Sequence, residues 1–286
     1  MPIHYPTLKG WSIPAVEQSY TERDTMLYAL GLGLGLDPID PRELRFVYED
    51  GLRALPTMAV VLGYAGFWLQ DPALGVDWKR VLHGEEALEF HRPFAPAGTV
   101  VGVHSIDRVI DKGAGRGALI VWTRTLYDKP SGAKLATVTQ TTFCRAEGGF
   151  EGGDAPLPAP AAVPERVPDQ VCDRPTPAQM ALVYRLSADR NPLHADPAVA
   201  AEAGYPRPIL HGLATLGVAG FAILKTLCDC DPTRLRTLSV RFSAPVYPGE
   251  TIRTEIWRER ERIAFRARVL ERDVVVLDRG SATLAG

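Results

Sequence analysis

Hydrophobic and polar residues alternate along several segments of the chain, and this period of two predicts β-strands. The alternating segments are residues 99–110, 117–128 and 134–145 in the first half and residues 251–260, 263–271 and 274–284 in the second. An apolar, helix-like segment precedes the strands in each half, from Thr57 to Leu69 and from Leu213 to Leu227. We therefore predict an α+β fold in which each half wraps an antiparallel sheet around one long helix.

The two halves share the same spacing of aromatic and proline residues. The motif Phe-x-x-Pro-x-x-Pro begins at Phe90 and recurs at Phe242, which predicts that the halves are structural repeats. A stretch rich in proline and small residues, 151–177, separates them and is typical of a linker. The predicted organisation is an N-terminal repeat at 1–150, the linker at 151–177 and a C-terminal repeat at 178–286.

Composition and charge indicate a globular protein. The chain has 286 residues, of which 46% are hydrophobic and 23% charged, and a formal net charge of −2. This balance gives no global attraction to nucleic acid or to an anionic membrane, so neither is an expected partner. The polar, proline-containing start of the chain does not resemble a signal peptide, and no uninterrupted apolar run reaches about twenty residues. We therefore expect a cytoplasmic protein.

The four cysteines suggest neither a metal site nor a disulfide framework. Cys228 and Cys230 are too close together for the usual zinc spacing, and no histidine follows at a suitable distance. Cys144 and Cys172 lack a companion motif that would mark a nucleophile. We expect all four to be reduced and structural, with no metal bound.

The richest candidate chemistry lies around a proline in the second half. Asp189 and His194 are five residues apart, which would place them on different faces of a continuous helix. Pro192 lacks an N–H and disfavours helical geometry at Asn191, so the chain must turn there. A turn lets the carboxylate and the imidazole point into one space beside the Asn191 amide. This arrangement predicts a proton-transfer pair with a polar positioning group.

Two helix starts flank this candidate pair. Asp196 can cap a short helix that begins at Pro197 and closes at Gly204. Further along, Gly212 stands at the amino end of the apolar segment that we expect to be a buried helix. Unpaired N–H groups at such an end carry partial positive charge, and glycine lets a carbonyl oxygen approach them. An enolate-forming reaction needs this kind of donor.

These residues resemble the hydratase 2 motif of MaoC-like (3R)-specific enoyl-CoA hydratases, which runs Tyr-x-x-Ser-Gly-Asp-x-Asn-Pro-Leu-His and continues to a His-Gly-Leu helix start. The matching positions are Tyr184, Ser187, Asp189, Asn191, Pro192, Leu193, His194, His211, Gly212 and Leu213. Ala188 departs from the glycine usual in the family. The resemblance implies the double-hotdog fold, two hotdog repeats in one chain, which commonly pairs again as a homodimer.

The resemblance also implies the reaction, the reversible syn addition of water to trans-2-enoyl-CoA to give (3R)-3-hydroxyacyl-CoA. Asp189 and His194 would hold the water, Asn191 would orient the water or the pair, and the Gly212 N–H would stabilise charge on the thioester oxygen. Which member of the pair is the base stays open, because it depends on their coupled protonation. The reaction implies no metal or redox cofactor. Coenzyme A is part of the substrate and not a cofactor of the protein.

Contacts with the substrate are implied as well. The residues expected to touch the coenzyme or the acyl chain are His83, Gly84, Lys112, Arg190, Pro192, Leu193 and Phe242. The first half carries only a faint counterpart of the motif around Tyr20, with no histidine near Asp24. We therefore expect one active site per chain, with the degenerate first half accommodating the acyl group.

Three alternatives remain open at this point. A hotdog thioesterase would hydrolyse the thioester on the same scaffold, and a dehydratase would act on acyl carrier protein instead of coenzyme A. A non-catalytic acyl-CoA-binding module would bind thioesters without turnover.

Overall fold

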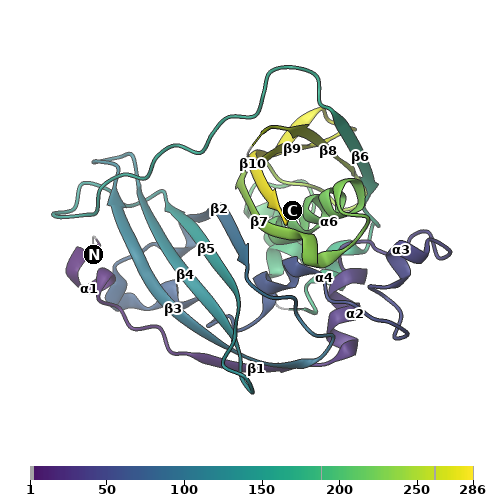
Figure 1. The fold of residues 1–286 in the computed structure, drawn as a ribbon. Coiled ribbons are helices and arrows are strands. Elements are labelled where there is room, and N and C mark those ends of the chain that lie inside the picture. The colour runs from purple at the N-terminus through teal and green to yellow at the C-terminus, as the bar shows by residue number, and fades with distance from the viewer. Residues whose placement is uncertain (1–2, 188, 261, 286) are drawn as a thin grey trace.

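A computed structural model describes residues 3–187, 189–260 and 262–285, and the ten strands in these ranges form one antiparallel sheet. The strand order is β1-β3-β4-β5-β2-β7-β10-β9-β8-β6. The strands are β1 (Val16–Tyr20), β2 (Val81–Phe90), β3 (Gly98–Asp111), β4 (Ala118–Asp128), β5 (Lys134–Cys144), β6 (Gln170–Pro175), β7 (Leu235–Phe242), β8 (Thr251–Arg258), β9 (Ile263–Val269) and β10 (Val274–Leu284). All six segments predicted from alternation are strands. Pairing of β2 with β7 joins the two halves into one continuous sheet (Figure 1).

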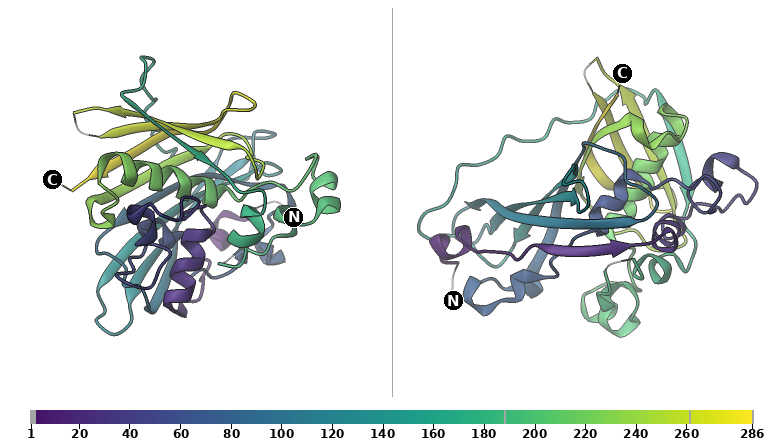
Figure 2. Two further views of the ribbon diagram at one scale, coloured as in Figure 1. Left: turned by 90° about the vertical axis from the view of Figure 1, so that its right-hand side faces the viewer. Right: turned by 60° about the horizontal axis from the view of Figure 1, so that its bottom comes forward.

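The second half wraps its strands around the helix α6 (Gly212–Leu227), as predicted. Every residue from Ala214 to Leu224 is buried, because the helix packs between the second-half strands and the first half of the chain (Figure 2). Small residues on the helix permit close approach: a Cβ at Gly220 would lie 2.8 Å from the Thr57 side chain. The interior of this half is therefore a packed core.

The first half lacks the corresponding long helix, so the prediction for Thr57 to Leu69 is wrong. The segment forms a short 3₁₀ turn, η1 (Pro56–Val61), and then an irregular loop before η2 (Trp68–Gln70). Gly63 and Gly66 have φ of +58° and +75°, values that a right-handed helix excludes. A Cβ at Gly63 would also come within 3.0 Å of the Gly102 Cα on β3, so glycine is required there.

The segment predicted as a linker, 151–177, is only partly irregular. Residues 151–169 arch from the first half to the second without helix or strand (Figure 1). The next residues form β6, which pairs with β8 at the edge of the sheet. The linker therefore ends in a strand of the second half.

Short helices and 3₁₀ turns connect the strands and α6. They are α1 (Tyr5–Lys9), α2 (Glu22–Leu30), α3 (Pro41–Leu44), α4 (Met180–Tyr184) and α5 (Pro197–Glu202), with the 3₁₀ turns η3 (Pro72–Leu74), η4 (Trp78–Arg80), η5 (Pro192–His194) and η6 (Pro232–Arg234). The short helix predicted after Asp196 is α5, which Asp196 caps through the Ala198 N–H. The Tyr28 and Tyr184 rings lie 5.9 Å apart and join α2 to α4, just before the candidate pair. No helix in the described ranges is both long enough and apolar enough to cross a bilayer.

Candidate active site

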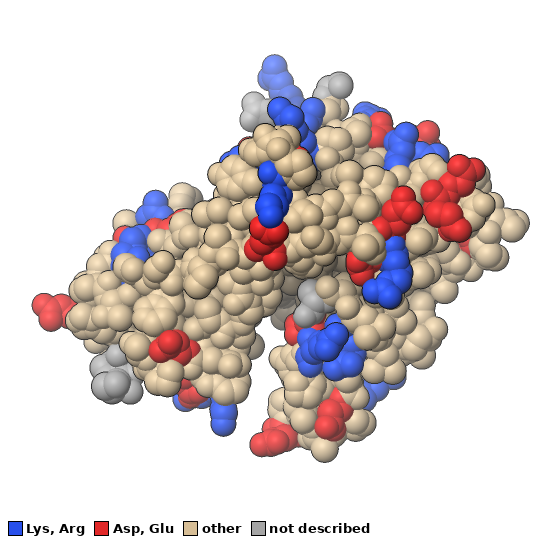
Figure 3. All heavy atoms as spheres, turned by 90° about the horizontal axis from the view of Figure 1, so that it is seen from below, with Lys and Arg blue, Asp and Glu red and all other residues tan. Residues whose placement is uncertain are grey.

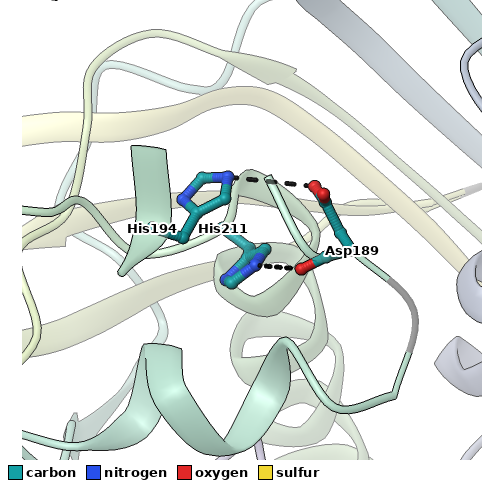
Figure 4. A group of neighbouring side chains, drawn as sticks. All are labelled: Asp189, His194 and His211. Carbon is teal, nitrogen blue, oxygen red and sulfur yellow. Dashed lines mark hydrogen bonds and ion pairs between the residues drawn. The ribbon is translucent and has the colours of Figure 1, made fainter. Parts of the chain in front are cut away.

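The predicted turn brings Asp189 and His194 together at one end of α6. Asp189 Oδ1 accepts the Asn191 N–H at 2.9 Å, and Asn191 Oδ1 accepts the Leu193 N–H at 3.0 Å. Pro192 then opens η5. This sequence of side-chain caps reverses the chain and leaves His194 Nε2 3.8 Å from Asp189 Oδ2 (Figure 4). The gap is too wide for a direct hydrogen bond and narrow enough for one water molecule to contact both groups.

The tautomer of His194 is fixed by the backbone. Its Nδ1 lies 2.9 Å from the Ile209 carbonyl oxygen, which can only accept, so Nδ1 carries the proton. Burial lowers the pKa of His194, against smaller opposing effects of the Ile209 hydrogen bond and the Asp189 charge. The neutral ring therefore presents a free Nε2 lone pair toward Asp189. Such a lone pair can accept a proton from a bound water.

His211 supports this arrangement, and the sequence analysis named it only as a motif position. Its ring stacks on His194 with centroids 3.7 Å apart, and its Nε2–H donates to the Asp189 carbonyl at 3.0 Å (Figure 4). Burial lowers the pKa of His211 to about 4, and the neighbouring His194 adds to this effect. Among the described residues, its Nδ1 has no hydrogen-bond partner. The neutral ring therefore holds both members of the pair in place.

Gly212, the first residue of α6, has a backbone N–H with no partner within the described ranges. A Cβ there would meet the Phe242 ring at 3.2 Å, so the ring closes over the helix start. Phe242 in turn packs against His83, with ring centroids 4.6 Å apart. His83 Nε2 lies 2.9 Å from Glu86 Oε2. Three predicted residues from different elements thus meet beside the unpaired N–H.

Gly84 follows His83 at a β-bulge in β2 and is required by close packing. The pairing of β2 with β5 shifts register between His83 and Glu85. A Cβ at Gly84 would lie 3.1 Å from the Thr141 carbonyl oxygen. The bulge directs the His83 side chain toward Phe242.

The other predicted residues occupy more peripheral positions. Arg190, Asn191 and Pro192 are exposed on the turn itself, and Leu193 is half-buried. The exposed Lys112 has its Nζ 4.7 Å from the Phe143 ring, and no direct contact with Asp189 or His194 is present in the described part of the chain. Ala188 lies outside the described residues.

The site contains three possible metal ligands, yet their orientation does not suit a metal. One ligand atom each of Asp189, His194 and His211 lies within 4.8 Å of the others. The two imidazoles are stacked with centroids 3.7 Å apart and an interplanar angle of 26°, so their lone pairs lie in separate, nearly parallel planes. Ligands of one metal ion must instead converge on it.

One continuous sheet, a single wrapped helix and an Asp–His pair at the amino end of that helix define a double-hotdog protein with a candidate acid/base site. The sequence matches the MaoC like domain over residues 160–279 and the MFE-2 hydratase 2 N-terminal domain over residues 18–146. The chain belongs to the MaoC-like dehydratase family, which confirms the resemblance.

Relatives cover nearly the whole chain. It is 39% identical to the protein named enoyl-CoA hydratase 2, peroxisomal, of Arabidopsis thaliana, over 94% of this chain and 92% of that one. It is also 39% identical to the enoyl-CoA hydratase ChsH3 of Mycobacterium tuberculosis, over 97% of both chains. A crystal structure of a MaoC-like dehydratase from Phytophthora capsici superposes with a TM-score of 0.87 at 33% identity, covering 99% of both chains. The double-hotdog fold is thereby confirmed.

Proposed function

We propose that this chain catalyses the reversible hydration of trans-2-enoyl-CoA to (3R)-3-hydroxyacyl-CoA, as a hydro-lyase. The observation that carries the proposal is the 3.8 Å gap between His194 Nε2 and Asp189 Oδ2 near the helix start that bears the free Gly212 N–H. Acid/base groups and an oxyanion donor are the two requirements of addition to a conjugated thioester. The names of the relatives support the substrate class.

In the proposed reaction, one water molecule sits between Asp189 and His194. Its oxygen bonds to C3 while His194 Nε2 accepts one of its protons, and the electrons of the double bond move onto the thioester oxygen. The Gly212 N–H stabilises this enolate, and losing one such donor typically costs on the order of 100- to 1000-fold in rate. The proton then returns from the pair to C2 on the same face. The net change is the syn addition of H and OH, with no metal or redox cofactor.

The test is the loss of enoyl-thioester absorbance in three variants. Asp189→Asn and His194→Ala are expected to lower kcat by about 100-fold or more. Asp196→Asn is the matched control, because asparagine also caps a helix and Asp196 lies on the same segment outside the pair. Turnover by Asp189→Asn at the rate of the control would contradict the proposal.

The same assay separates the rival functions. Release of free thiol from acyl-CoA would indicate a thioesterase, and hydration only of acyl-carrier-protein substrates would indicate the carrier-protein dehydratase. Thioester binding without turnover by the unaltered protein would indicate a binding module.

We also propose that the other predicted residues around the pair contact the substrate. Phe242 and His83 would line the thioester region beside Gly212, since their rings pack there. The exposed cations Lys112 and Arg190 would meet the phosphates of coenzyme A. Replacing either cation by methionine is expected to raise KM more than it lowers kcat.

Assembly and location are proposals of the same kind. The exposed Leu30 and Leu182, on the adjoining helices α2 and α4, favour a homodimer in which this apolar surface is covered. Sedimentation of the purified protein tests the dimer. We place the protein in the cytoplasm, and the peroxisomal name of the plant relative makes cell fractionation the appropriate test.

A further inference from the structure

The first-half sheet carries polar side chains where a hotdog repeat would have a helix packed on apolar residues. His104 on β3 and Arg124 on β4 are direct cross-strand partners. Arg124 points toward η1, since its Nη2 donates to the Ala59 and Val60 carbonyls at 3.2 and 2.9 Å. Without a long helix here, these side chains face the space between the sheet and the loop after η1.

Arg124 is a buried cation with incomplete pairing. It is only 2% exposed, and its Nε has no hydrogen-bond partner among the described residues. Within the described ranges no carboxylate makes an ion pair with it. Glu86 is near enough to act on its charge, but one oxygen of that carboxylate is held by His83. A buried cation in this state costs stability unless an acceptor completes its coordination.

His104 adds a second set of unused polar atoms. Both of its ring nitrogens are buried and unpaired in the described part of the chain. The carbonyls of Pro14 and Gly63 lie nearby without hydrogen-bonding geometry. Burial, together with the Arg124 charge, lowers the pKa of His104 to about 4. The neutral ring therefore has one N–H donor, with two carbonyls nearby but poorly aligned, and one lone pair that no donor among the described residues reaches.

Tyr64 links this cluster to the proposed active site. Its ring lies 5.5 Å from the Arg124 guanidinium, and the residue is 38% exposed. Burial raises its pKa to about 12, and the charges of Arg124 and Asp189 act on it in opposite directions. Tyr64 is therefore near enough to both Arg124 and Asp189 for their charges to act on it.

A cavity lies beside η1, the turn to whose carbonyls Arg124 donates. It has a volume of about 120 Å³ and extends from Leu186 and Ser187, just before Asp189, to Val61 and Leu62, just before the Gly63–Tyr64 turn. On the face seen from below, the surface is hollowed between two lobes (Figure 3). An acyl group lying in the cavity would reach η1, the turn that Arg124 holds.

We infer that Tyr64, His104 and Arg124 form a binding site for an oxygen acceptor, a carboxylate or a keto oxygen, on the far part of the acyl group. A methyl end would leave the Arg124 Nε–H and the His104 N–H without a well-aligned acceptor, whereas an oxygen can accept from both. The substrate class is then an enoyl-CoA whose acyl group is oxygenated away from the thioester. This inference rests on the proposed hydratase function and specifies its substrate.

The experiment compares trans-2-enoyl-CoA substrates of equal chain length that end in a methyl group, a methyl ketone or a carboxylate. Over a series of chain lengths, we expect kcat/KM for an oxygenated substrate to exceed that of its methyl counterpart by about ten- to a hundredfold at the matching length. Preference for the carboxylate over the ketone, or the reverse, identifies the acceptor.

Variants distinguish ligand binding from a role in holding η1. Arg124→Met and His104→Phe are expected to bring the kcat/KM ratio of oxygenated to methyl substrate close to one, mainly through KM. Arg108→Met, on β3 but bonded only to the Ala155 carbonyl, is the matched control and should keep the wild-type ratio. Equal losses on both substrates in Arg124→Met would mean that Arg124 only supports the loop.

The unaltered protein alone can overturn the inference, so it does not depend on whether a variant folds. Hydration of methyl-ended substrates with no preference for oxygenated ones at any length would mean that water fills the cluster, and would leave the proposed function intact. Failure to hydrate any enoyl-CoA would instead refute the proposed function.

Discussion

Replacing His211 by phenylalanine is expected to make the protein less sensitive to acid. Burial lowers the pKa of His211 to about 4, from an ordinary value of 6.5. Between these two values the unfolded chain binds a proton that the folded protein does not, so stability falls as pH decreases. Integrating this difference gives a loss of about 2 kcal/mol at about pH 5 and almost none at about pH 7.5. Phenylalanine can keep the stack on His194 without titrating.

Urea unfolding of both proteins at these two pH values measures the effect. The variant is expected to be less stable at the higher pH, because the Asp189 carbonyl loses its donor, a cost of about 1 kcal/mol. Its further loss on acidification should be smaller than that of the wild type by about 2 kcal/mol. His4→Gln, at an exposed histidine, controls for removing one imidazole. Equal acid-induced losses in wild type and variant would show that His211 is not held neutral by burial.

Three further outcomes are expected. Glu43→Ala should cost about 3–5 kcal/mol in urea unfolding, because it strips the buried Arg174 of its carboxylate, and a loss below about 1 kcal/mol would contradict the burial of this ion pair. Gly102→Ala should cost about 2 kcal/mol or more, because its Cβ would lie 2.3 Å from the Gly63 carbonyl oxygen; an unchanged Tm would mean that the loop is free to move away. Prolonged dialysis against a chelator should leave hydration unchanged, and activity restored only by added metal would refute the metal-free reaction.

Local patterns in the sequence predicted the parts of the fold that depend on local order. Alternation identified six strands, because every second side chain of a strand faces the core. The apolar run identified α6, because this helix is buried on all sides. The same criterion failed between Thr57 and Leu69. The residues there are apolar enough for a helix, but Gly63 and Gly66 adopt positive φ, and the chain turns instead. The apolar composition of a segment indicates that it is buried, but it does not show that the segment is helical.

In the candidate site, too, the sequence predicted only the features that depend on neighbouring residues in the chain. Asp189 and His194 stand on one short segment, so their spacing and the proline between them indicated a shared space. The stack of His211 on His194 depends on how α6 meets that segment, which no local pattern encodes. The cross-strand pair of His104 and Arg124 is even harder to predict from the sequence, since each residue alone looks like an ordinary polar position in an alternating strand.

The first half acts on the proposed chemistry through the helix that it packs against. A Cβ at Gly217 of α6 would lie 2.7 Å from Leu32, and one at Gly220 would lie 2.8 Å from Thr57, so first-half residues touch the helix at its two interior glycines. These contacts fix the position of α6 and thereby of Gly212 at its start. The first half has no long helix of its own on its sheet. Arg124 on β4 instead points from that sheet toward η1. The first half thus supports the proposed oxyanion donor, and in our proposal it also shapes the space for the acyl group.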